Sequence, residues 1–196
     1  MHERRHLCVF LGSSNRADPR YFDAARAVGG ALADADLSLV YGGAKVGLMG
    51  ALADAALAAG AEVRGVIPSQ LADKEVAHDG LTELFVVDSM HERKVRMYEL
   101  ADAFLALPGG FGTFEELFEI STWAQLGLHA KPIGVLDVAG YYTPLRTFLD
   151  GAVTGGLLAK EHRGLLLFDD DPNRLVTKLT THEPPIFDKL IGREST

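Results

Sequence analysis

The chain alternates short, continuously apolar runs with alanine-rich amphipathic stretches of helix length, and this rhythm restricts its fold more than any other feature. Apolar runs without polar alternation are typical of strands that are buried on both faces of a sheet. Helix-length segments between successive strands predict right-handed crossovers, and therefore parallel pairing of the strands. The predicted fold is a single α/β domain, doubly wound and Rossmann-like, with a mostly parallel sheet flanked by helices.

The rhythm divides the chain into predicted strands and helices. We predict strands at residues 7–11, 37–41, 62–67, 84–87, 103–107, 133–136 and 165–168. We predict helices at residues 19–35, 46–59, 90–100, 113–126, 141–153 and 172–181. Residues 69–80 lack a clear period, which favours a loop or a short irregular helix. The domain is expected to cover residues 1–183, followed by a C-terminal tail at 184–196.

Composition and charge narrow the classes of partner. With 196 residues, 47% of them hydrophobic, the chain can bury one core without disulfides or a structural metal. The formal net charge of -8 argues against nucleic acid, although local arginines and backbone amides can still bind a small anion. No run of about 18 apolar residues predicts a membrane span. The single cysteine, Cys8, favours a reducing, cytoplasmic compartment.

The strongest functional signal is the glycine-rich segment Pro108-Gly109-Gly110-Phe111-Gly112-Thr113, which joins a predicted strand to a predicted helix. Glycines allow a sharp turn that brings backbone N–H groups close to a phosphate, and the helix dipole adds about half a positive charge. The alternative is a tight strand–helix turn that binds nothing. No Lys-Ser/Thr pair follows the last glycine, so the segment is not the Walker loop of an ATPase.

Glu116 lies just beyond this loop and has two interpretations. Thr113 and Glu116 have the spacing of a capping box, in which both side chains satisfy amides at a helix end. In the functional interpretation, the Glu116 carboxylate faces the ribose of a bound nucleotide. It then stabilises the oxocarbenium-like cation of N-glycoside cleavage or activates water. Of the neighbouring Glu115 and Glu119, at least one is expected to face solvent.

A second group of candidates lies on the predicted helix before the glycine-loop strand. Met90, Arg93 and Met97 follow one another at i, i+3 and i+7, so they share one face of that helix. A guanidinium between two methionines on a buried face requires an anionic partner. The alternative is that the Arg/Lys/Arg run at residues 93–96 forms a solvated helix surface.

Three weaker candidates lie near the predicted carboxyl ends of the strands, where doubly wound sheets bind their ligands. Ser14 follows the first strand and either donates to a phosphate or caps a turn. Gly43 belongs to the glycine-rich stretch 42–50, which either lines the crevice or allows close helix–strand packing. Thr122 lies beyond the glycine loop and reaches a ligand only if its helix faces the crevice.

These motifs are similar to those of the LONELY GUY family, the cytokinin riboside 5′-monophosphate phosphoribohydrolases. The family signature Pro-Gly-Gly-x-Gly-Thr-x-x-Glu is matched from Pro108 to Glu116, and a Met-x-x-Arg-Lys element is matched from Met90 to Lys94. The likeness also includes Gly12-Ser13-Ser14 and the stretch from Val40 to Gly50, and it covers most of residues 7–180.

The resemblance implies a set of site residues. Arg93 and Glu116 would be the catalytic pair: Arg93 anchors the substrate and stabilises charge, and Glu116 stabilises the cation or positions water. Further substrate contacts are implied at Glu75, Lys94, Gly109, Gly110, Phe111, Gly112, Thr113, Phe114, Glu115 and Thr122. Ser14, Gly43 and Met90 remain the weaker candidates.

The implied reaction is hydrolysis of nucleoside 5′-monophosphates, such as AMP or N6-isopentenyl-AMP, to a free base and ribose 5-phosphate. The resemblance implies a homodimer that uses neither a metal nor a cofactor. Members of the family have also been labelled lysine decarboxylases, but neither Lys45 nor Lys94 has a context typical of a Schiff-base lysine. The alternative function is a non-catalytic carrier of a nucleotide or phosphorylated cofactor, which would not need the pair Arg93 and Glu116.

Overall fold

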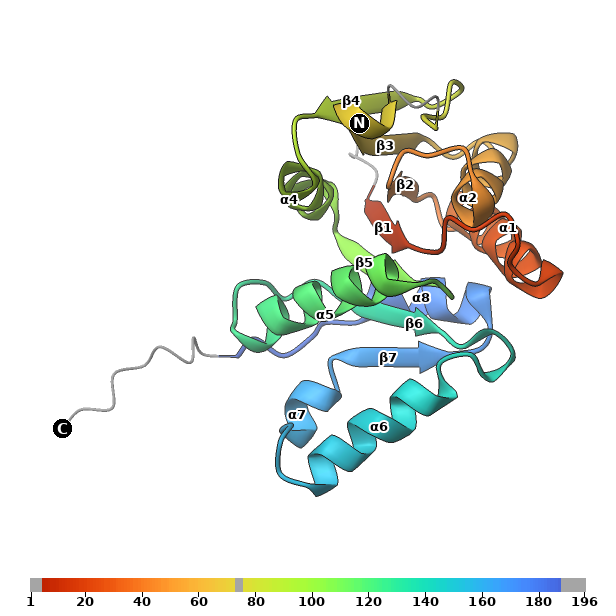
Figure 1. Ribbon diagram of the computed structural model, residues 1–196. Coiled ribbons are helices and arrows are strands. Elements are labelled where there is room, and N and C mark those ends of the chain that lie inside the picture. The colour runs from red at the N-terminus through yellow and green to blue at the C-terminus, as the bar shows by residue number, and fades with distance from the viewer. Residues whose placement is uncertain (1–4, 73–75, 188–196) are drawn as a thin grey trace.

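One parallel sheet forms the centre of the molecule (Figure 1). The computed structural model describes residues 5–72 and 76–187, and these contain a sheet of seven strands in the order β4-β3-β2-β1-β5-β6-β7. All neighbouring strands pair in parallel. The strands are β1 (His6–Phe10), β2 (Ser38–Tyr41), β3 (Val63–Pro68), β4 (Glu83–Val87), β5 (Ala103–Ala106), β6 (Ile133–Leu136) and β7 (Leu166–Asp169). The predicted Rossmann-like α/β fold is therefore confirmed.

Helical segments connect each strand to the next. They are α1 (Pro19–Asp34), α2 (Gly47–Ala58), α3 (Ser69–Ala72), α4 (Met90–Leu100), α5 (Phe111–Gln125), the 3-10 turn η1 (Val138–Gly140), α6 (Thr143–Thr154), α7 (Lys160–Arg163) and α8 (Pro172–Thr181). The sequence did not predict η1 or α7, because segments of three or four residues are too short to show a helical period. The helix predicted to begin at residue 113 begins at Phe111.

Two hydrophobic cores lie on opposite faces of the sheet, and the side chains of β1 alternate between them. Leu7 and Val9 pack in the core that is covered by α1, α2 and α8. Cys8 and Phe10 pack in the core to which α4, α5 and α6 contribute. In Figure 1, α1 and α2 accordingly lie on one side of the sheet while α4 and α5 lie on the other. This double covering explains why the strands are continuously apolar.

The order of the strands reverses between β1 and β5. The chain builds outward from β1 to β4, returns to place β5 beside β1, and then continues to β7. Such a reversal opens a crevice outside the carboxyl ends of the two central strands. The turns that follow them meet there, because the backbone N–H of Gly12 donates to the carbonyl of Pro108 at 3.1 Å. The fold therefore directs attention to the predicted glycine loop.

Two further expectations concern the ends of the chain and membranes. Within the described residues, no helix is both long enough and apolar enough to cross a membrane. The helix α8 ends at Thr181, and residues 188–196 lie outside the described part of the chain. The division between a domain ending at residue 183 and a tail therefore stays a prediction.

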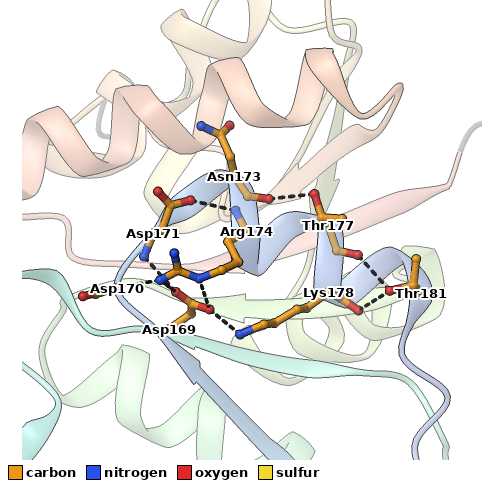
Figure 2. Close-up of polar contacts among 8 residues, drawn as sticks. All are labelled: Asp169, Asp170, Asp171, Asn173, Arg174, Thr177, Lys178 and Thr181. Carbon is orange, nitrogen blue, oxygen red and sulfur yellow. Dashed lines mark hydrogen bonds and ion pairs between the residues drawn. The ribbon is translucent and has the colours of Figure 1, made fainter.

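At the outer end of the sheet, a buried carboxylate attaches α8 to β7 (Figure 2). Asp169 accepts hydrogen bonds from Nε of Arg174 at 2.9 Å, from Nη2 of Arg174, from Nζ of Lys178, and from the backbone N–H of Asp171 at 3.0 Å. Its side chain is only 3% exposed. The hydrogen bonds from Arg174, followed by those from Lys178, hold the pKa of Asp169 well below its usual range. The folded protein therefore stabilises the ionised form of Asp169.

We predict that Asp169→Asn lowers the free energy of unfolding by about 1–3 kcal/mol, because two cations lose their buried acceptor. A carboxyl whose pKa is lowered by folding stabilises the protein above its unfolded pKa and loses that contribution as the pH falls. The difference between wild type and variant should thus be full above roughly pH 4 and shrink below it. Denaturant unfolding across pH measures this. Asp170→Asn is the matched control, because Asp170 contacts the same Arg174 from an exposed position, and an equal loss there would refute the assignment.

Candidate active site

A cavity of about 250 Å³ lies at the carboxyl ends of the central strands, and the strongest sequence candidates line it. Its walls come from the ends of β1 and β2, from α4, and from the first turns of α5. Arg93 and Glu116 both face this cavity, together with Gly42, the glycine-loop residues Gly110 to Thr113, and Met97. Residues that are far apart in the sequence are thus brought to one site.

Local capping sets the start of α4 and thereby the direction of Arg93. The Ser89 hydroxyl accepts a hydrogen bond from the backbone N–H of Glu92 at 3.1 Å, and the Glu92 carboxylate accepts one from the N–H of Asp88 at 2.9 Å. This reciprocal arrangement is a form of capping box. From that start, Arg93 and Met97 lie on the face of α4 that turns toward the sheet, and both are buried.

The Arg93 guanidinium is held by backbone carbonyls. Its Nε donates to the carbonyl of Val66 at 3.0 Å, and its Nη2 donates to that of Gly42 at 3.2 Å. A Cβ atom at Gly42 would lie 1.8 Å from Nη2, so the glycine makes room for the guanidinium. Arg93 is only 9% exposed, and the interpretation of residues 93–96 as a solvated surface is therefore wrong for this residue.

The anionic partner that the sequence requires for Arg93 is not a bonded carboxylate. Among the residues that the structure describes, no aspartate or glutamate forms an ion pair with Arg93. Glu116 interacts with Arg93 by long-range electrostatic attraction and not by a hydrogen bond. Buried guanidinium groups with N–H groups directed at a cavity are suited to bind anionic ligand atoms.

Glu116 is a half-buried carboxyl group that borders the same cavity. Within the described part of the chain, no side chain or backbone group forms a hydrogen bond with it. Burial raises the pKa of Glu116 to about 7, against the opposing effect of the nearby Arg93. A carboxyl group with a pKa near neutrality can change its protonation state at physiological pH, which is typical of groups that take part in acid–base or charge-stabilising chemistry.

The capping-box interpretation of Thr113 and Glu116 is wrong. The N-cap of α5 is Gly110, so Thr113 occupies the third helical position and Glu116 lies a further turn along. Gly110 makes no side-chain cap hydrogen bond at this helix start. The N–H groups of the first turn, those of Phe111, Gly112 and Thr113, have no acceptor within the helix. Together with the helix dipole, they form a site suited to a phosphate.

Close packing maintains the shape of the glycine loop. A Cβ atom at Gly109 would lie 2.0 Å from Oγ1 of Thr113 and 2.9 Å from the backbone nitrogen of Gly12. At Gly110 an added Cβ would meet nothing within 4 Å. The first glycine is therefore required by packing, whereas the second leaves space on the side of the crevice.

Two tyrosines that the sequence analysis did not select donate hydrogen bonds to backbone carbonyls at the start of this loop. The Tyr141 hydroxyl donates to the carbonyl of Gly109, and the buried Tyr142 hydroxyl donates to that of Leu107 at 2.7 Å. The side chain of Asp137 in turn accepts from the backbone N–H of Tyr142 at 2.6 Å. Their signal in the sequence is weak, because a tyrosine pair at a helix start is equally compatible with ordinary core packing.

Two other predicted contacts, Lys94 and Glu115, pair with each other. Lys94 Nζ donates to Oε1 of Glu115 at 2.5 Å and to Oε1 of Glu119 at 2.9 Å. The hydrogen bond that Lys94 donates to Glu115 is the largest influence on the pKa of Lys94 and raises it. Glu115 is exposed, as expected for at least one of the two glutamates, and Glu119 is half-buried. Both carboxylates accept from the ammonium group of Lys94.

The remaining candidates on α5 and α4 lie outside the cavity of their own chain. Phe114 packs edge to face on Tyr142, with ring centroids 6.1 Å apart. Thr122 is exposed, and its hydroxyl donates to the carbonyl of Phe118 within α5. Met90 is half-exposed, and its Sδ lies 3.9 Å from Nη1 of Arg93.

The candidates outside these helices also differ in position. Ser14 is exposed; its hydroxyl accepts from the N–H of Arg16 and borders a second cavity on the other side of the glycine loop. Gly43 has a φ of 74° and packs against β3 rather than lining the cavity. Gly42 lines the cavity, in agreement with the first interpretation of the stretch 42–50. Gly47 lets the start of α2 approach the backbone of Ser13, which lies in the turn after β1 rather than in a strand. Glu75 lies outside the described residues.

We predict that Gly109→Ala destabilises the protein by about 1–3 kcal/mol, because the new methyl group forces Thr113 and the Gly12 turn to move. Gly110→Ala is the matched control in the same loop, since it adds the same atom in open space. Thermal unfolding of both variants measures the difference. Equal destabilisation of the two variants would contradict the packing described for Gly109.

Sequence comparisons match most of this chain to a family model and to named proteins. Residues 49–179 match a protein-family model described as "Possible lysine decarboxylase". Cytokinin riboside 5′-monophosphate phosphoribohydrolase LOG7 of Arabidopsis thaliana is 44% identical over 96% of this chain and 87% of its own length. The probable cytokinin riboside 5′-monophosphate phosphoribohydrolase LOGL9 of Oryza sativa subsp. japonica is 48% identical over 92% of this chain and 79% of its own length.

Solved structures with the same fold include proteins of other description. The molybdenum cofactor binding protein from Rippkaea orientalis superposes with a TM-score of 0.70 at 18% identity, over 92% of this chain and 98% of that one. The molybdenum cofactor carrier protein of Chlamydomonas reinhardtii gives a TM-score of 0.68 at 18% identity, over 92% and 100% of the two chains. At this identity, the similarity concerns the fold alone.

Proposed function

The chain belongs to the LONELY GUY family, and we propose that it hydrolyses the N-glycosidic bond of nucleoside 5′-monophosphates, cytokinin riboside 5′-monophosphates among them. The products are a free base and ribose 5-phosphate. The observation that carries the proposal is the meeting of three features in one cavity: a helix N-terminus with free N–H groups, the buried Arg93, and the carboxyl group of Glu116.

The phosphate binds at the start of α5. The N–H groups of Phe111, Gly112 and Thr113 point out of the first turn and find no acceptor there, so a phosphate can supply it. This local arrangement explains how a chain with a net charge of -8 holds an anion. Because the loop packs tightly at Gly109, the phosphate position is defined before the substrate arrives.

Glu116 and Arg93 act on the ribose and the reacting bond. As the bond between C1′ and the base nitrogen breaks, its electron pair leaves with the base and positive charge develops on the ribose. The ionised Glu116 stabilises that charge and orients a water molecule, which supplies the hydroxyl group on C1′ and the proton on the base. Arg93 keeps N–H groups for the substrate's oxygen atoms, because the carbonyls of Val66 and Gly42 engage only part of its guanidinium.

Lysine-based decarboxylation is not supported by the two lysines nearest the crevice. A Schiff-base lysine must lose its proton, which requires a lowered pKa. Lys94 has a raised pKa and two carboxylate partners, and Lys45 pairs with Asp79 at 3.1 Å. The description of the family model as a lysine decarboxylase therefore finds no counterpart in these side chains.

The proposal predicts that the protein releases free base and ribose 5-phosphate from AMP and from N6-isopentenyl-AMP, and that Glu116→Gln lowers kcat by about 100-fold or more. Since the ionised form of Glu116 acts, kcat/KM should fall as the pH drops through about 7. Chromatographic assay of both products measures this.

Two controls accompany this assay. Glu99→Gln removes an exposed carboxylate from α4 and should leave turnover unchanged. Glu116→Gln should fold at least as stably as wild type at pH 8, because a carboxyl group whose pKa is raised by folding destabilises the fold when ionised. Binding of AMP without release of either product would instead favour a carrier of phosphorylated ligands.

We further propose that the protein is a cytoplasmic homodimer that associates through the outer face of α5. Phe111 is 96% exposed, and Phe118 follows seven residues later on the same face. Thr122 continues this face and does not reach the cavity of its own chain, so a partner subunit would account for a ligand contact at that position. Cys8 is the single cysteine of the sequence and is buried, so no disulfide forms within the chain, which suits a reducing compartment such as the cytoplasm.

The dimer is tested by light scattering coupled to size-exclusion chromatography. Wild type should elute as a dimer, and Phe118→Asp should elute as a monomer, because a charge in an apolar interface is costly. Phe148→Asp is the control, since Phe148 is an equally large and more exposed side chain on α6. A monomeric wild type, or dissociation by Phe148→Asp alone, would contradict the proposed interface.

A further inference from the structure

A charged bridge joins the two helices that carry Arg93 and Glu116. Lys94 directly follows Arg93 on α4, and Glu115 directly precedes Glu116 on α5. Lys94 Nζ lies 2.5 Å from Oε1 of Glu115 and 2.9 Å from Oε1 of Glu119. We call these three side chains the Lys94 bridge.

The bridge lies at a narrow space between the helices rather than on an open surface. Lys94, Glu116 and Glu119 border this space, which adjoins the main cavity. The Lys94 side chain is only 17% exposed. On the same two helices, Tyr98 and Trp123 meet edge to face, with ring centroids 5.1 Å apart. Ion pairs thus join α4 to α5 near the cavity, and an aromatic contact joins them farther along.

The contacts of Lys94 are more consistent with a role toward protein groups than with a substrate contact. Its ammonium group already has two carboxylate acceptors, so a substrate phosphate would have to compete with both. The bridge also carries an uneven charge, because one ammonium group faces two carboxylates. Its net negative charge lies beside Glu116 in sequence and in space, where solvent screening is weak.

We propose that Lys94 is a positioning residue that joins α4 to α5 through Glu115 and Glu119 and sets the charge that faces Glu116. This inference rests on the proposed role of Glu116 in hydrolysis and explains how that role is tuned. Removal of the ammonium group leaves two carboxylates opposed to a third. Removal of one carboxylate leaves the ammonium group balanced by a single carboxylate.

The other charged groups near Glu116 do not replace the bridge. From α4, Arg93 and Lys94 favour the ionised form of Glu116. From α5 itself, Glu115 and Glu119 disfavour it. From β1, the thiol of Cys8 faces Glu116, but burial raises its pKa well above the usual range, so it remains neutral. Apart from Arg93, the positive and the negative charges that act on Glu116 all belong to the Lys94 bridge, so substitutions in the bridge can remove either sign.

The test is a carboxyl ¹³C NMR titration of Glu116, assigned by comparison with Glu116→Gln. Lys94→Met should raise the titration midpoint by on the order of one pH unit, because a nearby opposite charge is lost. Glu119→Gln should lower the midpoint. The acidic limb of kcat/KM should move in the same two directions. A purely structural clamp would not produce shifts of opposite sign, so shifts in one direction, or none, would overturn the proposal.

Further variants distinguish the effect of the Lys94 charge on Glu116 from a loss of folding and from a loss of activity. Lys94→Arg keeps the charge and should keep the wild-type midpoint, and Arg96→Gln removes a cation from the outer side of α4, where it pairs with Glu99, and should change nothing. If Lys94→Met fails to fold, the downward shift in Glu119→Gln remains decisive, and its absence overturns the proposal. If wild type releases no base, the proposed function fails, yet the NMR titration still decides whether the bridge sets the charge at Glu116.

Discussion

Two glycine turns touch at the centre of the sheet, and the placement of the candidate site depends on that contact. Gly12 follows β1 and Gly109 follows β5, and neither turn leaves ordinary space for a Cβ atom between them. The contact exists because the strand order reverses at this point. The helix α4 precedes β5 in the chain, and α5 follows it. Both helices pack on the same face of the sheet, so Arg93 and Glu116 line one cavity.

The candidate site contains buried ionisable groups that lack the partners usual in a protein core. Arg93 is buried without a bonded carboxylate, and Glu116 is half-buried without a hydrogen bond among the described residues. Burial of Glu116 disfavours its ionised form in the absence of a ligand, and burial of the Arg93 guanidinium without an anion costs free energy. Asp169 is the opposite case, because its cationic partners satisfy it fully and its role is to attach α8. The contrast separates a buried charge that is fully paired, Asp169, from the buried charges of the candidate site.

Much of the candidate site could be predicted from residue spacing. The glycine loop and the inward face of Arg93 follow from local periodicity, and both line the cavity. The interpretation of Thr113 as a helix cap failed because α5 begins two residues earlier, at Phe111, with Gly110 as its N-cap. Helix boundaries depend on a few hydrogen bonds at the end of a segment, which periodicity does not specify.

The sequence by itself determined the layers of the fold, since apolar runs and helical periods are local properties of a chain. It also marked the loop at the start of α5. Only the tertiary structure decided that Arg93 bonds to the carbonyls of β3 and of the turn after β2, that Lys94 bridges to Glu115, and that Tyr141 holds the loop. The physical reason is that these partners come from separate elements. Their meeting depends on the order of strands in the sheet, which no local pattern encodes.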